Sequence, residues 1–183
     1  MKTFIASGIA AAALVSGASA DVTVSFTNQT WTGFNFTDLT ATYGGFSGTL
    51  TGVSVNATLN ASTNFTYADD LCVYVDPAPL GTGGLLQVGG FSDLFATQRL
   101  SWANGGSNTP GTTVIDSKSV NPIVFSGSAA DPKIWLGNGY GAAGTSGTFT
   151  GSITLIGVNA VPAPGAVALL GVAGLAAGRR RRA

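Results

Sequence analysis

The chain has 183 residues with eight basic and eight acidic side chains, no histidine and a single cysteine, Cys72. This composition excludes an intrachain disulfide, a histidine-based catalytic triad and a transition-metal site built from His and Cys. Once both ends are set aside, residues 21–160 keep three cations against eight aspartates, a net charge of −5. That charge argues against nucleic acid as a partner, because Lys and Arg must neutralise its phosphates.

The N-terminal segment has the pattern of a secretory signal peptide. Lys2 precedes an apolar run over residues 4–15, and Ala18 and Ala20 fit the small-residue rule for cleavage. An ordinary buried helix would carry polar residues along one face, whereas this run contains only small serines. We therefore expect residues 1–20 to be removed on export.

The segment 21–158 has the composition of a single all-β domain. Thr, Ser, Val, Phe, Gly and Asn dominate it, and no sustained helical periodicity runs through it. Turn clusters divide it into short strands at a spacing typical of a β-sandwich or jelly roll. In chain order, the strands are expected at 22–27, 31–43, 48–59, 71–75, 83–90, 95–102, 112–120, 122–127, 133–137 and 147–158.

Hydrophobic alternation assigns the faces of these strands. In the strand 48–59, apolar residues at every second position from Val53 to Leu59 alternate with polar ones, which predicts one buried face and one wet face. The strand 147–158 alternates in the same way. The strand 71–75 is apolar throughout, so we expect it at the centre of a sheet with both faces covered. Cys72 lies within it and is expected to be a buried, unreactive thiol.

Aspartate is the only carboxylate available for catalysis or metal binding. Asp69 and Asp70 are the candidate calcium ligands, with Asp76 or Asp93 as a third, because calcium takes carboxylate and carbonyl oxygens from loops. The simpler alternative is that the adjacent pair caps a turn and keeps a sheet edge soluble. The scattered aspartates give no glycosidase signature, so we do not expect an enzyme.

Aromatic side chains offer a second kind of site, because their rings present apolar faces on which a sugar can stack. Trp102, beside the Gly- and Asn-rich loop 103–111, is the first candidate, and Trp31 and Trp135 are the others. The alternative for each is core packing. Thr- and Asn-rich outer strand faces are a further candidate surface for ice or polysaccharide, although the threonines have no fixed spacing.

The C-terminal segment 159–183 joins a proline motif to an uncharged run and an arginine cluster. Residues 160–178 carry no charge and would span about 28 Å as a helix, close to the bilayer core of about 30 Å. The prolines confine the regular helix to the part after Pro164, so this predicted transmembrane span is marginal. The residues expected to stop transfer on the cytoplasmic side are Arg179, Arg180, Arg181 and Arg182.

This order of elements resembles the PEP-CTERM sorting signal of bacterial exported proteins. The matching motif is Val161, Pro162, Ala163 and Pro164, followed by the apolar run and the arginines. The resemblance implies recognition by an exosortase, cleavage near the Pro-x-Pro element, and delivery to the cell surface or the exopolysaccharide matrix. The motif is also catalogued as an ice-binding-protein C-terminal segment, a label that does not imply ice binding. Ala163 stands where the family has glutamate, a difference that bears on cleavage more than on membrane engagement.

The body also resembles, over residues 50–75 and 134–158, the P-domain-like jelly roll of proprotein convertases. That resemblance concerns the fold only. The sequence thus predicts an exported structural or adhesive protein of the cell surface or extracellular matrix, held at the membrane at least transiently by its tail. The alternative is a carbohydrate-binding module, with or without calcium, presented by the same route.

Overall fold

The structure, a computed structural model, describes residues 21–77, 81 and 83–161. The expected signal peptide, with Ala18 and Ala20, lies outside these residues, as do the predicted transmembrane span, the arginine cluster and all of the sorting motif except Val161. The backbone N–H of Val161 donates to the carbonyl of Gly45 at 3.0 Å. Within the described ranges, no helix has the length and apolar character needed to cross a bilayer.

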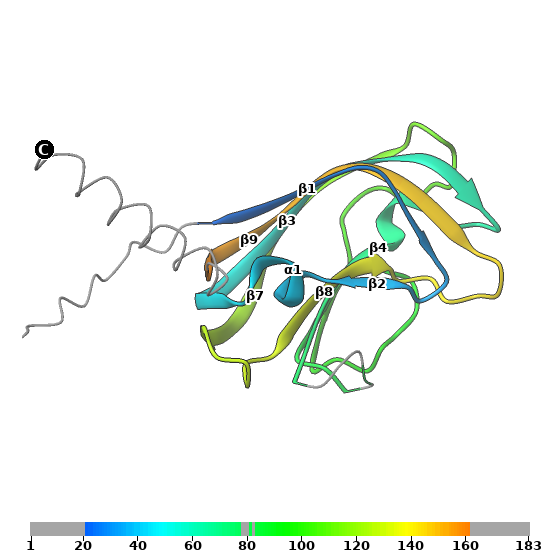
Figure 1. Cartoon of the computed structure of the whole chain (residues 1–183). Helices are drawn as coiled ribbons and strands as arrows, with labels where there is room; N and C mark the ends of the chain where they lie inside the picture. The colour runs from blue at the N-terminus through cyan, green and yellow to red at the C-terminus, as the bar shows by residue number, and fades with distance from the viewer. Residues whose placement is uncertain (1–20, 78–80, 82, 162–183) are drawn as a thin grey trace, which may run out of the picture.

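The described residues form two β-sheets, which confirms the expected all-β class (Figure 1). Sheet A has the strand order β1-β9-β3-β7 and sheet B the order β2-β8-β4-β5-β6. Paired strands are antiparallel, except that β5 and β6 are parallel. The elements are β1 Val22–Thr32, β2 Phe36–Asp38, α1 Leu39–Tyr43, β3 Phe46–Thr63, the 3-10 helix η1 Ala68–Asp70, β4 Leu71–Asp76, β5 Leu86–Val88, β6 Gln98–Leu100, β7 Thr113–Ser126, β8 Lys133–Asn138 and β9 Ser146–Ala160.

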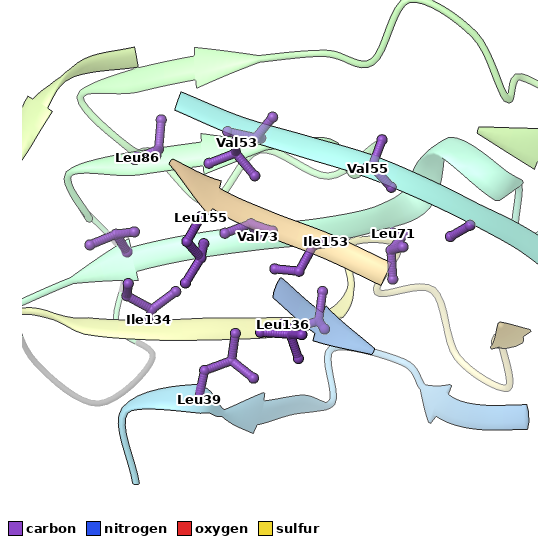
Figure 2. Packing of buried hydrophobic residues seen from close by; sticks show 14 of the residues in the cluster. Leu39, Val53, Val55, Leu71, Val73, Leu86, Ile134, Leu136, Ile153 and Leu155 are labelled. Atoms are coloured by element: carbon purple, nitrogen blue, oxygen red, sulfur yellow. The ribbon is translucent and has the colours of Figure 1, made fainter. Parts of the chain in front are cut away.

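The hydrophobic core lies between the two sheets (Figure 2). Sheet A contributes the apolar face of β3, including Val53 and Val55, and the matching face of β9, with Ile153 and Leu155. Sheet B supplies the opposing apolar side chains from β4, β5 and β8, such as Leu136. Fully burying one aliphatic side chain of this kind stabilises a fold by about 1.5–3 kcal/mol. The alternation predicted for both long strands is therefore confirmed.

Strand β4 is the third of five strands in sheet B, and it is buried over its whole length. This confirms the central position expected from its uninterrupted apolar sequence. Cys72 lies in this strand, and burial together with the nearby Asp70 carboxylate raises the pKa of the thiol. A thiol held protonated in this way is a poor nucleophile.

One of the expected strands does not form as a single strand in the structure. The expected strand 31–43 is divided among the end of β1, the short β2 and the helix α1. Asp38 caps this helix, because its Oδ1 accepts the backbone N–H of Ala41 at 2.9 Å, and Gly44 ends it in a left-handed conformation with φ 77°. A local cap therefore overrides the β propensity of the threonines.

The expected strands 112–120 and 122–127 form one continuous strand, β7. Pro122 is tolerated because β7 is an edge strand of sheet A and its pairing with β3 shifts register between Leu50 and Gly52. A proline there removes no ladder hydrogen bond. The break expected between residues 120 and 122 is therefore absent.

Candidate functional site

A hollow of about 700 Å³ opens where β4 begins and β5 ends. A smaller hollow of about 270 Å³ shares Tyr67, Asp70 and Phe91 with it and adds Phe65 and Tyr140. We call the two together the aromatic hollow. The larger part is lined by Tyr67, Asp69, Asp70, Gly89, Gly90, Phe91, Arg99, Ser101, Trp102 and Gly106.

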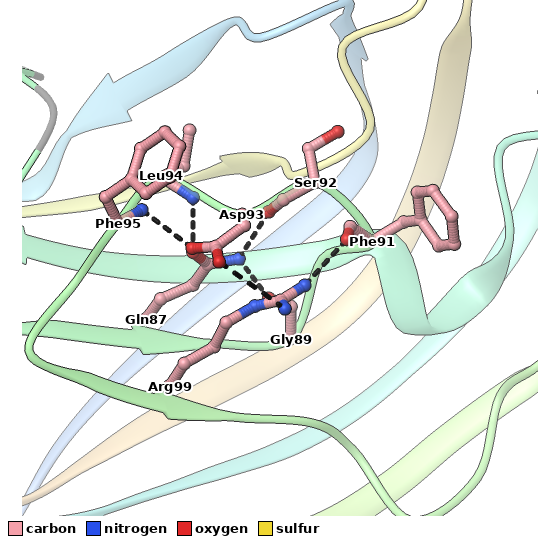
Figure 3. Close-up of polar contacts among 8 residues, drawn as sticks. All are labelled: Gln87, Gly89, Phe91, Ser92, Asp93, Leu94, Phe95 and Arg99. Carbon is pink, nitrogen blue, oxygen red and sulfur yellow. Dashed lines mark hydrogen bonds and ion pairs between the residues drawn. The ribbon is translucent and has the colours of Figure 1, made fainter.

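Phe91 is the most exposed aromatic ring of the aromatic hollow, with 74% of its surface accessible. Its backbone is nevertheless held at both polar groups. The N–H donates to Asp70 Oδ1 at 3.1 Å. The carbonyl accepts from a guanidinium nitrogen of Arg99 at 2.7 Å, a bond drawn in Figure 3. Its ring meets that of Tyr140 edge to face, with centroids 5.7 Å apart. An exposed apolar ring on a fixed backbone is preorganised for contact with a partner.

The loop that carries Phe91 is organised by the buried side chain of Gln87 in β5 (Figure 3). Its Nε2 donates to the carbonyls of Gly89 and Ser92 at 3.2 and 2.7 Å, and its Oε1 accepts the N–H of Leu94 at 3.0 Å. The N–H of Ser92 in turn donates to Gly139 at 2.9 Å. The amide of this one side chain therefore holds the backbone of the loop at three residues, Gly89, Ser92 and Leu94.

Asp70 lies in the floor of the aromatic hollow with 2% of its surface accessible. Besides the N–H of Phe91, it accepts the N–H of Tyr67 through Oδ2 at 2.7 Å. The pKa of Asp70 is raised to about 6, chiefly by burial and with help from the charge of Asp69, while the hydrogen bonds from the backbone N–H groups of Tyr67 and Phe91 oppose the rise. Asp70 thus joins two segments of the rim.

Asp69 differs from Asp70, because its side chain is not engaged by another residue in the part of the chain that the structure describes. Its backbone N–H donates to Gly105 at 3.2 Å and its carbonyl accepts from Gly90 at 2.9 Å, which fixes its position between two loops. Burial raises the pKa of the carboxyl, opposed by a bond from its own backbone N–H. The Asp69 carboxylate therefore lines the hollow as an available acceptor.

The expected third calcium ligand does not join this pair. Among residues 21–77, 81 and 83–161, no three Asp or Cys side chains gather in a way that could hold a metal ion. Asp76 accepts the indole N–H of Trp135 at 2.9 Å, and Asp93 accepts a backbone N–H two residues further on at 2.7 Å. The bonds that Asp70 makes fit the turn-capping alternative.

The structure places the candidate Trp102 in the hollow, but with only 6% of its surface accessible. Its indole N–H donates to the carbonyl of Leu71 at 2.7 Å, so the ring supports the site from within. Trp31 is buried against Phe149 in the core. The rings that the hollow offers to solvent belong mainly to phenylalanine and tyrosine, which sequence reasoning did not single out.

The threonine-rich outer face of sheet A forms aligned hydroxyl pairs. Hydroxyl oxygens lie 2.8–3.0 Å apart between neighbouring strands, in the pairs Thr23–Thr154, Thr30–Thr148 and Thr58–Thr113. Register shifts interrupt the pairing of β1 with β9 and of β3 with both neighbours. These hydroxyls bond to one another on an irregular sheet, so the face is a weaker candidate than the aromatic hollow.

No family model, curated protein or solved structure matches this chain. The aromatic hollow therefore has to be interpreted from its own residues and geometry.

Proposed function

We propose that the protein is an exported adhesive component of the cell surface or extracellular matrix, and that its β-sandwich binds carbohydrate through the aromatic hollow. The observation that carries the proposal is Phe91, an exposed ring whose backbone N–H and carbonyl are both held by side chains. Aromatic rings stack on the apolar C–H face of a sugar, and polar groups nearby fix its orientation. The aromatic hollow offers both kinds of group.

The proposed role is binding without hydrolysis. Glycoside hydrolysis uses two carboxyl groups, one as acid and the other as base or nucleophile. In the aromatic hollow, Asp70 is occupied by two backbone N–H groups, which leaves Asp69 as the available carboxylate.

We further propose, from the sequence resemblance, that the sandwich is a jelly roll of the P-domain type.

The proposed route to the surface depends on the two ends of the chain. A signal peptide at residues 1–20 would direct export, and an exosortase would recognise the motif Val161–Pro164 while the following apolar run engages the membrane. Cleavage near Pro164 would then release the body to the surface or the exopolysaccharide. The partners proposed are thus the export machinery, an exosortase and a glycan.

Glycan binding is tested by screening the full-length protein on an array of immobilised glycans. Phe91→Ala is expected to weaken retention at least about tenfold, since it removes a stacking surface worth about 1.4 kcal/mol. Phe95→Ala is the matched control, because Phe95 lies on the same loop, is 70% exposed and does not line the hollow. If the wild type retains no glycan, a purely structural role is favoured.

The sorting route is tested by intact-mass analysis of the protein recovered from its native cell surface. Loss of residues 1–20 together with a C-terminus near Pro164 would support export and cutting. A chain that lacks residues 1–20 but continues to Ala183 would contradict cutting and leave a membrane anchor.

A further inference from the structure

We infer that the aromatic hollow selects neutral sugar chains, with the Asp69 carboxylate accepting the hydroxyls of a sugar that stacks on Phe91. This inference rests on the proposed function and specifies the ligand class of the same site. It starts from a difference between the charged groups of the hollow: Asp70 and Arg99 are bonded to other residues, whereas the Asp69 carboxylate accepts only from its own backbone N–H.

The occupied groups are Asp70 and Arg99. Asp70 holds the backbone N–H groups of Tyr67 and Phe91. Arg99 donates to the carbonyl of Phe91 at 2.7 Å and lies 4.0 Å from Asp93. Both side chains therefore maintain the shape of the site, and the positive charge of Arg99 is opposed by the carboxylate of Asp93.

The third charged group is the carboxylate of Asp69, which no other described residue engages by a hydrogen bond. Its backbone is fixed by Gly90 on one side and Gly105 on the other. The rim beside it is formed by Gly106, where even an added Cβ would lie 3.8 Å from Asp69 Oδ2. A carboxylate has two oxygens and accepts hydrogen bonds only, so it can take two neighbouring hydroxyl donors at once. Neighbouring hydroxyls are what an unsubstituted sugar ring presents.

Charge separates neutral from acidic glycans at this position. A uronate, sulfate or phosphate group near Asp69 would face a fixed like charge, and like charges brought together disfavour binding. The body as a whole adds to this effect, because residues 21–160 carry a net charge of −5. We therefore expect unsubstituted hexose chains to bind and acidic chains to be rejected.

The experiment measures affinities of the full-length protein by titration calorimetry in buffer containing EDTA. The neutral probes are hexasaccharides of β-1,3-glucan, β-1,4-glucan and α-mannan, and the acidic probes are oligogalacturonate and oligoalginate. The binding variants are Asp69→Asn and Phe91→Ala. Asp21→Asn is the charge-matched control, since Asp21 is exposed, directly precedes β1 and is not among the residues that line the hollow.

We expect at least one neutral probe to bind the wild type, with acidic probes at least about tenfold weaker. Asp69→Asn should lower the neutral affinity at least about tenfold, the effect of losing one charge-assisted hydrogen bond, while Asp21→Asn leaves it unchanged. Equal binding by Asp69→Asn, tighter binding of acidic probes, or binding that appears only when calcium replaces EDTA would each overturn the inference. In each of those cases, the proposed function would still be supported if Phe91→Ala bound the glycan more weakly than the wild type does. If no glycan bound the wild type in any arm, both would fail.

Discussion

Asp70 and Phe91 are joined by a hydrogen bond of 3.1 Å, from the backbone N–H of Phe91 to Oδ1 of a buried carboxylate that precedes it by 21 positions. The other oxygen of Asp70 accepts the N–H of Tyr67 at 2.7 Å. One side chain therefore connects the segment before β4 to the turn after β5. The two aromatic residues that both parts of the hollow share are positioned by the same anchor.

Asp70→Ala is expected to lower the free energy of unfolding by about 2 kcal/mol, because two partly buried backbone N–H groups lose their acceptor. Urea denaturation of the full-length protein measures the change. Asp93→Ala is the control, since Asp93 is half exposed and its variant should stay within about 0.5 kcal/mol of the wild type. Equal stability of the two variants would contradict the anchoring role.

Asp70 is also expected to make the stability of the fold depend on pH. Burial raises the pKa of Asp70 from 3.8 to about 6, so over this interval the folded protein keeps a proton that the unfolded chain has lost. The free energy of unfolding should therefore fall as the pH rises from about 4 to about 6, and change little from this source above that range. Asp116 and Asp131 affect a different pH range. Their pKa values are lowered in the folded protein, so the stability that they contribute is lost only as the pH falls below about 4.

Urea denaturation of the wild type and of Asp70→Asn at a series of pH values isolates this contribution. Asp69, whose pKa is also raised, is present in both proteins, so its effect is shared. The wild type should lose more stability than the variant between about pH 4 and about pH 6. Parallel curves would show that Asp70 titrates alike in the folded and unfolded states.

Sequence reasoning located the strands best where burial leaves a periodic signal. The alternation in β3 and β9 and the unbroken apolar run of β4 record directly which faces are covered. The helix α1 was missed because Thr and Tyr favour strands, and only the cap at Asp38 and the glycine that follows decide otherwise. Edge position, which lets β7 continue through Pro122, depends on the strand order and has no local signature.

The candidate site was identified only in part. Asp69, Asp70 and Trp102, chosen from the sequence, do line the aromatic hollow, yet two of them are buried supports. Phe91 was missed because nothing local distinguishes an exposed phenylalanine from a core one. Gln87 did leave a signal: a glutamine inside an apolar strand has to satisfy its amide, which points to an organised neighbour.

Gln87→Met tests whether that amide organises the loop. The change keeps the length of the side chain but leaves the N–H of Leu94 and the carbonyls of Gly89 and Ser92 without their partner. We expect a loss of about 2–3 kcal/mol in the free energy of unfolding and faster amide hydrogen exchange over residues 89–97. Gln29→Met, at an exposed position of β1, is the control and should change neither quantity. If amide exchange over residues 89–97 were unchanged in Gln87→Met, the Gln87 amide would not be what orders the loop.

Gly89→Ala tests the close approach beneath the hollow. Gly89 has φ +75°, and an added Cβ would overlap the indole nitrogen of Trp102 and the carbonyl of Leu71, the two groups that bond to each other. Backbone strain alone costs about 1–3 kcal/mol, so Gly111→Ala is the matched control: its φ is +92° and no atom lies within 4 Å of the added Cβ. Gly89→Ala should be clearly less stable than this control, and tryptophan emission should shift to longer wavelength as Trp102 is displaced from its buried bond. Equal stability with unshifted emission would mean that the floor of the aromatic hollow can move aside, and that Trp102 does not fix it.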